Sequence, residues 1–145
     1  MEKELSTFIK DTFALEEPEA STYSPLVLAY IGDSVYDIII KSIIINKGNR
    51  QVQKLHEDTS KLVCASTQSL MMRAIQEHLT EAEHGVYRRG RNSKTVTPAK
   101  NQSITDYRRA TGFEALMGYL YLNKENERLM ELVKIGLEHI EGEVS

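Results

Sequence analysis

The chain has 145 residues, of which 41% are hydrophobic and 27% are charged, and its net charge at pH 7 is −3. This length fits one domain over residues 1–145, with a substantial core and little room for a second folded unit. The sequence contains no run of 18 apolar residues and no signal-peptide pattern at its start, so we expect a soluble, cytoplasmic protein that does not bind membranes. The single cysteine, Cys64, excludes an internal disulfide and a cysteine-based zinc site, and we expect it to be buried.

Apolar residues recur every three or four positions, and strand-like alternation is not sustained, so the chain is predicted to be an all-α helical bundle. A short amphipathic helix is expected over residues 3–14, followed by a turn over residues 16–22. A long helix then begins with Ser24 as its cap and Pro25 in its first turn, and it ends at Gly48. Because this helix is apolar on nearly every side, we expect it to form the centre of the core.

The second half of the chain continues the helical pattern. We predict two helices between residues 52 and 78 with a break at residues 65–67, a short helix from Thr80 to Arg89 or Gly90, a polar loop over residues 91–101, a helix from Ser103 or Thr105 to near Asn123, and a last amphipathic helix from Asn126 onward. The polar loop is the only long one, and long loops in compact domains tend to be functional or disordered.

An aspartate lies at the centre of the long apolar helix, where burial without a partner is costly. This residue, Asp33, follows Gly32, and a glycine inside a helix costs about 1 kcal/mol relative to alanine, which indicates a close helix contact. In a later helix, Glu114 shares one face with Gly118. If the two small-residue faces pack together, Asp33 and Glu114 meet and offer oxygen ligands to a hard divalent cation, Mg²⁺ or Mn²⁺.

Other interpretations of these acids remain open at this stage. A lone acid inside a helix is equally compatible with an ion pair to a core arginine. Asp37, one turn after Asp33, is a weaker candidate for the site, because capping, pairing or exposure is more usual for such a residue. The four histidines lack zinc-hydrolase spacing, and no phosphate-binding glycine loop or nucleophile elbow occurs, which argues against nucleotide triphosphate and acyl-transfer chemistry.

Basic residues are concentrated in one stretch of an otherwise acidic chain. Between Tyr87 and Arg109 there is one acid, Asp106, and the basic residues are Arg88, Arg89, Arg91, Lys94, Lys100, Arg108 and Arg109. This distribution indicates a surface that binds the phosphates of a nucleic acid, although a solvated loop would have the same composition. A carboxylate-held cation beside such a surface indicates phosphodiester hydrolysis.

Three segments in this order resemble the ribonuclease III family. Ala29-Tyr-Ile-Gly-Asp33-Ser-Val-Tyr36 resembles the signature helix of its catalytic domain. Thr111-Gly-Phe-Glu114-Ala-Leu-Met-Gly118 is similar to the later Asp-x-x-Glu-Ala-Leu-x-Gly motif of that domain. Together with Arg88-Arg-Gly-Arg-Asn-Ser-Lys94, they resemble the short bacterial Mini-ribonuclease III group, which consists of the catalytic domain alone, over residues 22–135.

The resemblance implies a ribonuclease III-type endonuclease domain that forms a twofold homodimer and cleaves double-stranded RNA with Mg²⁺, or with Mn²⁺ in its place. It implies 5′-phosphate and 3′-hydroxyl products and maturation of the ends of the 23S ribosomal RNA precursor, aided by a large-subunit ribosomal protein. Asp33 and Glu114 match the family's catalytic acids and would be the metal ligands. No double-stranded RNA-binding domain is expected, so the seven basic residues between Tyr87 and Arg109 would bind the RNA.

The chain departs from the family pattern at three acidic positions. Leu26 and Ala29 stand where longer members have glutamates, and Thr111 stands where they have an aspartate. Fewer acids predict weaker metal binding, with one firmly held ion completed by phosphate oxygens of the substrate. Two other functions remain open: a catalytically inactive helical RNA-binding or ribosome-assembly module, and a helical dimerisation protein whose basic loop is incidental.

Overall fold

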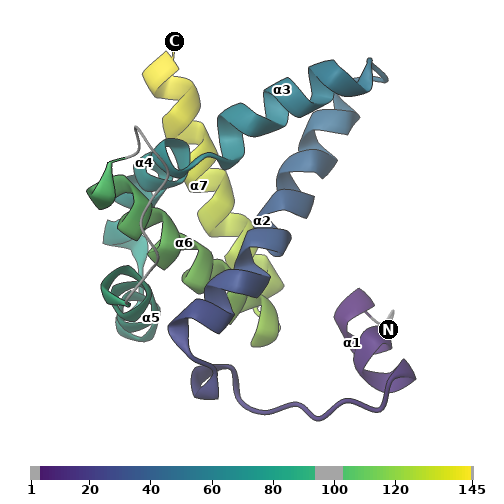
Figure 1. Ribbon diagram of the computed structural model, residues 1–145, viewed down its shortest axis with the longest axis vertical. Coiled ribbons are helices and arrows are strands. Elements are labelled where there is room, and N and C mark those ends of the chain that lie inside the picture. The colour runs from purple at the N-terminus through teal and green to yellow at the C-terminus, as the bar shows by residue number, and fades with distance from the viewer. Residues whose placement is uncertain (1–3, 94–102, 145) are drawn as a thin grey trace.

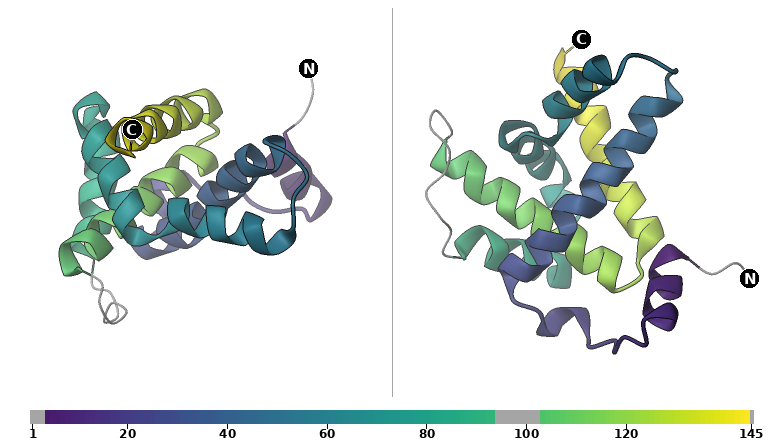
Figure 2. Two further views of the ribbon diagram at one scale, coloured as in Figure 1. Left: turned by 90° about the horizontal axis from the view of Figure 1, so that it is seen from above. Right: turned by 45° about the vertical axis from the view of Figure 1, so that its right-hand side comes forward.

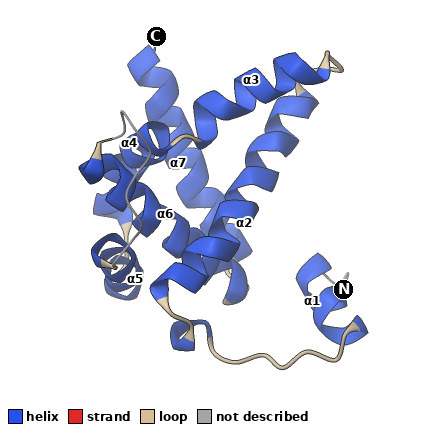
Figure 3. Ribbon diagram, viewed as in Figure 1, coloured by secondary structure: helices blue, strands red, loops and turns tan. Residues whose placement is uncertain are grey.

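The computed structural model describes residues 4–93 and 103–144, and the regular structure within these ranges is entirely helical (Figure 3). The helices are α1 (Leu5–Thr12), α2 (Pro25–Asn46), α3 (Val52–Val63), α4 (Ala65–Ile75), α5 (Glu81–Asn92), α6 (Ile104–Leu122) and α7 (Asn126–Val144), with short 3₁₀ turns at Ala20–Thr22 and Gln76–His78. The all-α prediction is confirmed for these residues, and the predicted break between the third and fourth helices falls at Cys64.

Helix α6 lies at the centre of the bundle, in contact with α2, α4 and α5 (Figure 1). Its buried side includes Gly112, Ala115 and Gly118, whose small size lets neighbouring helices approach closely. The prediction that the long helix α2 forms the centre of the core is therefore wrong. Helix α2 buries one side only, and the apolar residues exposed on its other side include Leu26, Val27, Tyr30, Ile38, Ile43 and Ile45. Apolar residues all round a helix do not reveal whether one chain covers every side of it.

Side-chain caps begin several of the helices. The Ser24 hydroxyl accepts a hydrogen bond from the Val27 backbone N–H at 3.3 Å, and Thr80 forms a capping box with Glu83. At α6 the cap is Ser103, one of the two predicted candidates, because its hydroxyl accepts from the Asp106 N–H at 3.3 Å. These caps satisfy backbone donors that the first turn of a helix leaves without partners.

The predicted end of α5 at Gly90 is wrong, because the helix continues to Asn92. A Cβ atom at Gly90 would lie 2.8 Å from Cβ of Ala115 and 3.0 Å from Cα of Gly112, both in α6. The glycine therefore marks a close crossing of α5 and α6 and does not terminate the helix. As a result Arg91, which we expected in the loop, lies in the last turn of α5.

The buried core is built from α2, α4, α5, α6 and α7, and partly buried side chains of α3 pack against it. At its centre the rings of Tyr36 and Phe113 meet edge to face, with centroids 5.2 Å apart, and the Tyr36 hydroxyl donates to the Leu62 carbonyl at 2.7 Å. Near one edge, Arg128 of α7 donates to both carboxylate oxygens of Glu83 at 2.9 Å. Glu83 is 4% exposed, and the Arg128 guanidinium lowers the pKa of this carboxyl.

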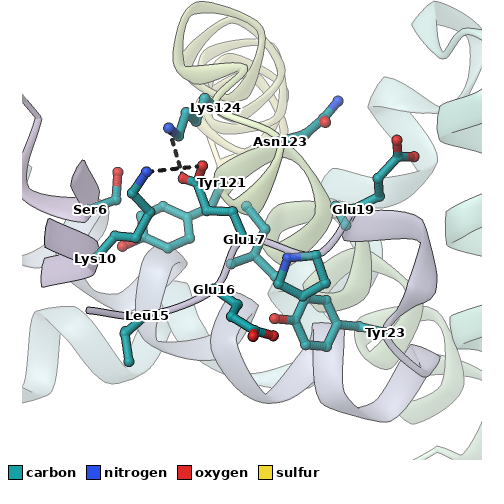
Figure 4. A pocket seen from close by; sticks show the side chains of 13 residues that line it. Ser6, Lys10, Leu15, Glu16, Glu17, Glu19, Tyr23, Tyr121, Asn123 and Lys124 are labelled. Atoms are coloured by element: carbon teal, nitrogen blue, oxygen red, sulfur yellow. Dashed lines mark hydrogen bonds and ion pairs between the residues drawn. The ribbon is translucent and has the colours of Figure 1, made fainter. Parts of the chain in front are cut away.

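Helix α1 lies outside this bundle, beside the turn between α6 and α7 (Figures 1 and 2). None of its residues is buried. Glu17, in the segment that follows α1, accepts from Lys10 at 3.3 Å and pairs with Lys124 at 2.8 Å, which ties this segment to the bundle (Figure 4). A pocket of about 380 Å³ lies here and contains none of the predicted site residues. The helix is shorter at both ends than the predicted 3–14.

Cys64 is exposed, so the expectation of burial is wrong. It occupies the junction where α3 ends and α4 begins, and its Sγ lies 3.2 Å from the Thr67 hydroxyl and 3.4 Å from the Ser66 hydroxyl. A helix junction lies at the surface even when the flanking residues are apolar. No helix within the described ranges is long and apolar enough to cross a membrane.

Candidate active site

The site begins where α2 crosses α6, at two glycines. A Cβ atom at Gly32 would collide with the Glu114 carbonyl oxygen and lie 2.8 Å from the Gly118 nitrogen. A Cβ atom at Gly118 would in turn collide with the Leu28 carbonyl oxygen. The backbones of the two helices are therefore in direct contact, as the sequence predicted from its small-residue faces. This contact places Asp33, which follows Gly32 in α2, beside Glu114 in α6.

The side chains of Asp33 and Glu114 interact directly. Burial raises the pKa of Glu114 to about 8, and the hydrogen bond with Asp33 and the charge of Asp33 act in the same direction. Asp33 itself is exposed, whereas Glu114 is half-buried. The expectation that Asp33 is the buried acid is therefore wrong, because α2 faces solvent on this side and the burial falls on the partner in α6. At neutral pH the Glu114 carboxyl therefore keeps its proton.

A third side chain contacts this pair and was not predicted from the sequence. Gln68 of α4 is 2% exposed, and its hydrogen bond with Glu114 partly offsets the rise in the pKa of that carboxyl. Its Nε2 donates to the Val63 carbonyl at 3.1 Å. One sequence signal could have revealed it: Gln68 occupies a core-facing position of α4, in helical spacing with Met71, Met72 and Ile75.

The donors at the site fit a hydrated divalent cation. Two carboxylates meet there, and the side-chain oxygen of Gln68 is buried without a hydrogen-bond partner among the described residues. Mg²⁺ is commonly bound by one or two carboxylates while it keeps several waters. No group of three His, Cys, Asp or Glu residues that could hold a metal occurs in the described part of the chain. The two carboxylates therefore supply fewer ligands than a metal site built entirely from protein side chains.

The three positions where the family pattern has further acids add no carboxylate. Leu26 is 44% exposed, and Ala29 and Thr111 are each 8% exposed. The Thr111 hydroxyl donates to the Tyr107 carbonyl of its own helix at 3.0 Å. None of these three side chains has a carboxylate, so Asp33 and Glu114 remain the acids of the site.

The alternative roles considered for the acids can also be checked. Within residues 4–93 and 103–144, neither Asp33 nor Glu114 forms an ion pair with a lysine or arginine. Asp37 pairs with Lys41 of the next turn at 2.9 Å, which is one of the ordinary roles expected for such a residue. A core arginine therefore does not account for the Asp33–Glu114 pair.

The predicted RNA-binding residues that the structure describes fall on α5 and α6, which pack against each other. Arg88 and Arg89 are exposed on α5, and Arg91 lies over the Tyr87 ring at 5.6 Å from its centroid. Arg108 is exposed near the start of α6. Lys94 and Lys100 lie outside the described residues.

Arg109 differs from the other predicted RNA-binding residues because protein groups already engage it. Its guanidinium donates to the Ser69 hydroxyl at 2.8 Å and lies 3.8 Å from the Asp106 carboxylate. Ser69 in turn donates to Asp106 at 2.7 Å. This network joins α4 to α6 close to Gln68, so Arg109 also has a structural role.

Comparison with known proteins shows the family. Residues 26–125 match the family described as the Ribonuclease III domain. The chain belongs to the ribonuclease III family. Among ribonuclease III family relatives, a Mini-ribonuclease 3 of Clostridium tetani is 55% identical over 113 residues, which are 77% of this chain and 75% of that protein. A Mini-ribonuclease 3 of Thermoanaerobacter is 43% identical over 141 residues, 97% of this chain and 99% of that protein.

A solved structure supports the same fold. The crystal structure of a protein from Fusobacterium nucleatum matches with a TM-score of 0.74 and 28% identity, covering 81% of this chain and 93% of that one. The predicted resemblance to the family and the predicted fold are thus confirmed.

Proposed function

We propose that this protein is a metal-dependent endoribonuclease that cleaves double-stranded RNA, with Asp33 and Glu114 as metal ligands and catalytic residues. Ribonuclease III domains act on double-stranded RNA, and members of the family use divalent metal ions. The observation that carries the assignment to these residues is the interaction of two carboxyls, neither of which is paired with a lysine or arginine in the part of the chain that the structure describes. Such a pair is unfavourable unless a proton or a cation lies between its members.

We propose Mg²⁺ as the ion, with Mn²⁺ able to replace it, because hard oxygen donors suit both. A divalent cation bound here would stabilise charge on the scissile phosphate and lower the pKa of a bound water. Asp33 and Glu114 would hold it, and the exposure of Asp33 leaves one side open to substrate. Phosphate oxygens of the RNA would complete the coordination that two carboxylates leave open.

The basic residues of α5 and α6, together with Lys94 and Lys100, would bind the phosphates of the RNA. Recognition should depend on phosphates, 2′-hydroxyls and duplex shape, because the major groove of A-form RNA is too deep and narrow to be read. We therefore expect the binding and cleavage of duplex RNA to depend little on its base sequence.

A twofold homodimer would let each subunit cut one strand of a duplex, whereas a monomer would only nick. Ribonuclease III domains usually dimerise. The exposed apolar side of α2, which includes Tyr30 at 80% and Ile38 at 62% exposure, supports a second copy of this chain as its cover. Sedimentation of the purified protein tests this directly: a monomer at micromolar concentration would contradict it.

The resemblance to the short group supports a finer assignment. We propose a cytoplasmic role in maturing the ends of the 23S ribosomal RNA precursor, with a large-subunit ribosomal protein as a partner and 5′-phosphate and 3′-hydroxyl products. Product mapping on a transcribed precursor, with and without ribosomal proteins, tests this assignment. Cuts scattered along the precursor, away from the mature ends, would contradict it.

The residue assignment is tested by cleavage of a long RNA duplex in Mg²⁺. Asp33→Asn and Glu114→Gln should each abolish cleavage while the proteins remain folded, because each change removes a ligand charge. Asp37→Asn is the matched control, since Asp37 lies one turn away and pairs with Lys41. Undiminished cleavage by a folded Asp33→Asn protein would refute the assignment.

A second function is favoured by the small number of acids at the site. A helical RNA-binding or ribosome-assembly module that has lost its activity would show the same departures at Leu26, Ala29 and Thr111. Such a protein would bind duplex RNA and leave it uncut even in Mn²⁺. The same cleavage assay, repeated in Mn²⁺ with a parallel binding measurement, therefore separates the two functions.

A further inference from the structure

Gln68 has an environment that folding alone does not explain. It is 2% exposed, yet its side-chain oxygen has no hydrogen-bond donor among the residues that the structure describes. A buried acceptor without a donor is costly, and an apolar side chain of the same shape would avoid that cost. Its neighbours on the same face of α4, Met71 and Met72, are apolar and fully buried. A methionine at position 68 would match them.

The amide nitrogen of Gln68, by contrast, has a hydrogen-bond partner. Nε2 donates to the Val63 carbonyl at 3.1 Å, at the point where α3 ends. The same side chain interacts with the Glu114 carboxyl in α6, where it acts to lower the pKa of that group. Gln68 therefore links the junction of α3 and α4 to one acid of the site.

The helix that carries Gln68 is fastened to α6 beside this contact. The hydroxyl of Ser69, the next residue, donates to Asp106 at 2.7 Å, and Ser69 is 1% exposed. Because Ser69 and Gln68 are adjacent on a rigid helix, this second bond limits how far Gln68 can move relative to Glu114. The amide is thus held on both sides.

We propose that Gln68 is a positioning residue that holds the Glu114 carboxylate in place beside Asp33 for binding of the divalent cation. This inference rests on the proposed function, since it assumes that the two acids bind a cation. Residues that orient metal ligands commonly change metal affinity by 10- to 100-fold when they are replaced. With only two carboxylates at the site, the orientation of each one contributes more than it would in a larger ligand set.

The test uses Gln68→Met, which keeps the unbranched shape and removes the amide. Thr59→Val is the matched control: Thr59 is 7% exposed, and its hydroxyl donates to the Leu55 carbonyl at 2.8 Å within α3. Both changes delete one buried polar group, but only the first touches the acid pair. Asp33→Asn serves as the variant that lacks a ligand.

The first measurement is Mn²⁺ binding to the full chain without RNA, by titration calorimetry. Gln68→Met should weaken binding by at least about tenfold, and Thr59→Val should leave it unchanged. The second measurement is thermal unfolding without divalent cations, in which Gln68→Met should keep or raise the wild-type midpoint. In cleavage of duplex RNA, kcat should fall while KM for RNA stays within about twofold.

Each outcome separates the positioning role from its alternatives. Wild-type Mn²⁺ affinity in folded Gln68→Met would overturn the inference and leave the proposed function intact. A Gln68→Met protein that unfolds, or melts well below Thr59→Val, would show that the role is structural and would also overturn it. Failure of the wild type to bind Mn²⁺, with Asp33→Asn unchanged, would remove the proposed metal site itself and the inference with it.

Discussion

Gly32→Ala tests whether the contact between α2 and α6 sets the geometry of the acid pair. The added Cβ would collide with the Glu114 carbonyl and lie 2.8 Å from the Gly118 nitrogen, whereas ordinary contact begins at 3.4 Å. Both obstacles are backbone atoms, so no side chain can turn aside. The helices must separate by on the order of 1 Å, since packed interiors have no spare volume.

This separation has an expected cost in stability and a larger one in activity. Overpacking of this kind destabilises by about 1–3 kcal/mol, and removal of a helical glycine returns about 1 kcal/mol. The net loss of about 0–2 kcal/mol leaves most molecules folded. A displacement of about 1 Å between catalytic groups costs on the order of 100-fold in rate. We therefore expect Gly32→Ala to be folded and nearly inactive.

Urea unfolding measures the first quantity, and initial rates on duplex RNA in saturating Mg²⁺ measure the second. Gly142→Ala is the control, because the Cβ that it adds to α7 meets nothing within 4 Å beyond the adjacent residues and backbone of its own helix. It should stabilise the protein by about 0.5–1 kcal/mol and leave cleavage unchanged. Wild-type rates for Gly32→Ala would refute the view that this crossing positions the acids.

Three further predictions concern charge. Arg128→Ala should cost about 3–5 kcal/mol in urea unfolding, because it leaves the Glu83 carboxylate buried without its cation; a loss below 1 kcal/mol would contradict this. In EDTA, Glu114 of the folded protein keeps its proton up to about pH 8, whereas in the unfolded chain it loses the proton near the ordinary pKa of a glutamate. The free energy of unfolding should therefore fall as the pH rises between these two pKa values. Glu114→Gln should abolish this fall, as measured by urea-unfolding midpoints from pH 5 to 8. Joint reversal of charge at Arg88 and Arg89 should weaken RNA binding and flatten its dependence on salt, and an unchanged salt slope would show that α5 does not contact phosphate.

The pairing of α2 with α6 could be predicted because local signals agreed. Glycines inside both helices allow their backbones to approach closely. Each helix also has an acid within one turn of its glycine, so the contact brings two carboxyls together. Helix starts at Ser24, Thr80 and Ser103 were equally legible, since the side chains that cap a helix act over three residues. In each case the sequence alone contained the interacting groups.

The predictions that were wrong share a different cause, which is that they depend on contacts between residues far apart in the sequence. Gly90 was interpreted as a helix end because a glycine serves either as a terminator or as a close contact, and the contacting residues in α6 lie more than 20 positions away. The exposure of Asp33 and of the apolar side of α2 depends on which surfaces the rest of the chain covers. The role of Gln68 could not be predicted, because it depends on Glu114, which lies on a different helix and is far from Gln68 in the sequence.

The small ligand set has a consequence for how cation and RNA would bind. At pH 7 the raised pKa of Glu114 keeps most molecules protonated there, so cation binding must displace a proton and is weakened by that requirement. Two ionised carboxylates balance one divalent ion, and phosphate oxygens would fill its remaining positions. Cation and duplex RNA should therefore bind cooperatively. The affinity of the wild-type chain for Mn²⁺, measured in the presence of a duplex with non-cleavable linkages, should exceed the RNA-free value, and it should rise with pH toward 8. Equal affinities with and without RNA would mean that water, and not RNA phosphate, fills the positions that the two carboxylates leave open, and this would refute the expected cooperativity.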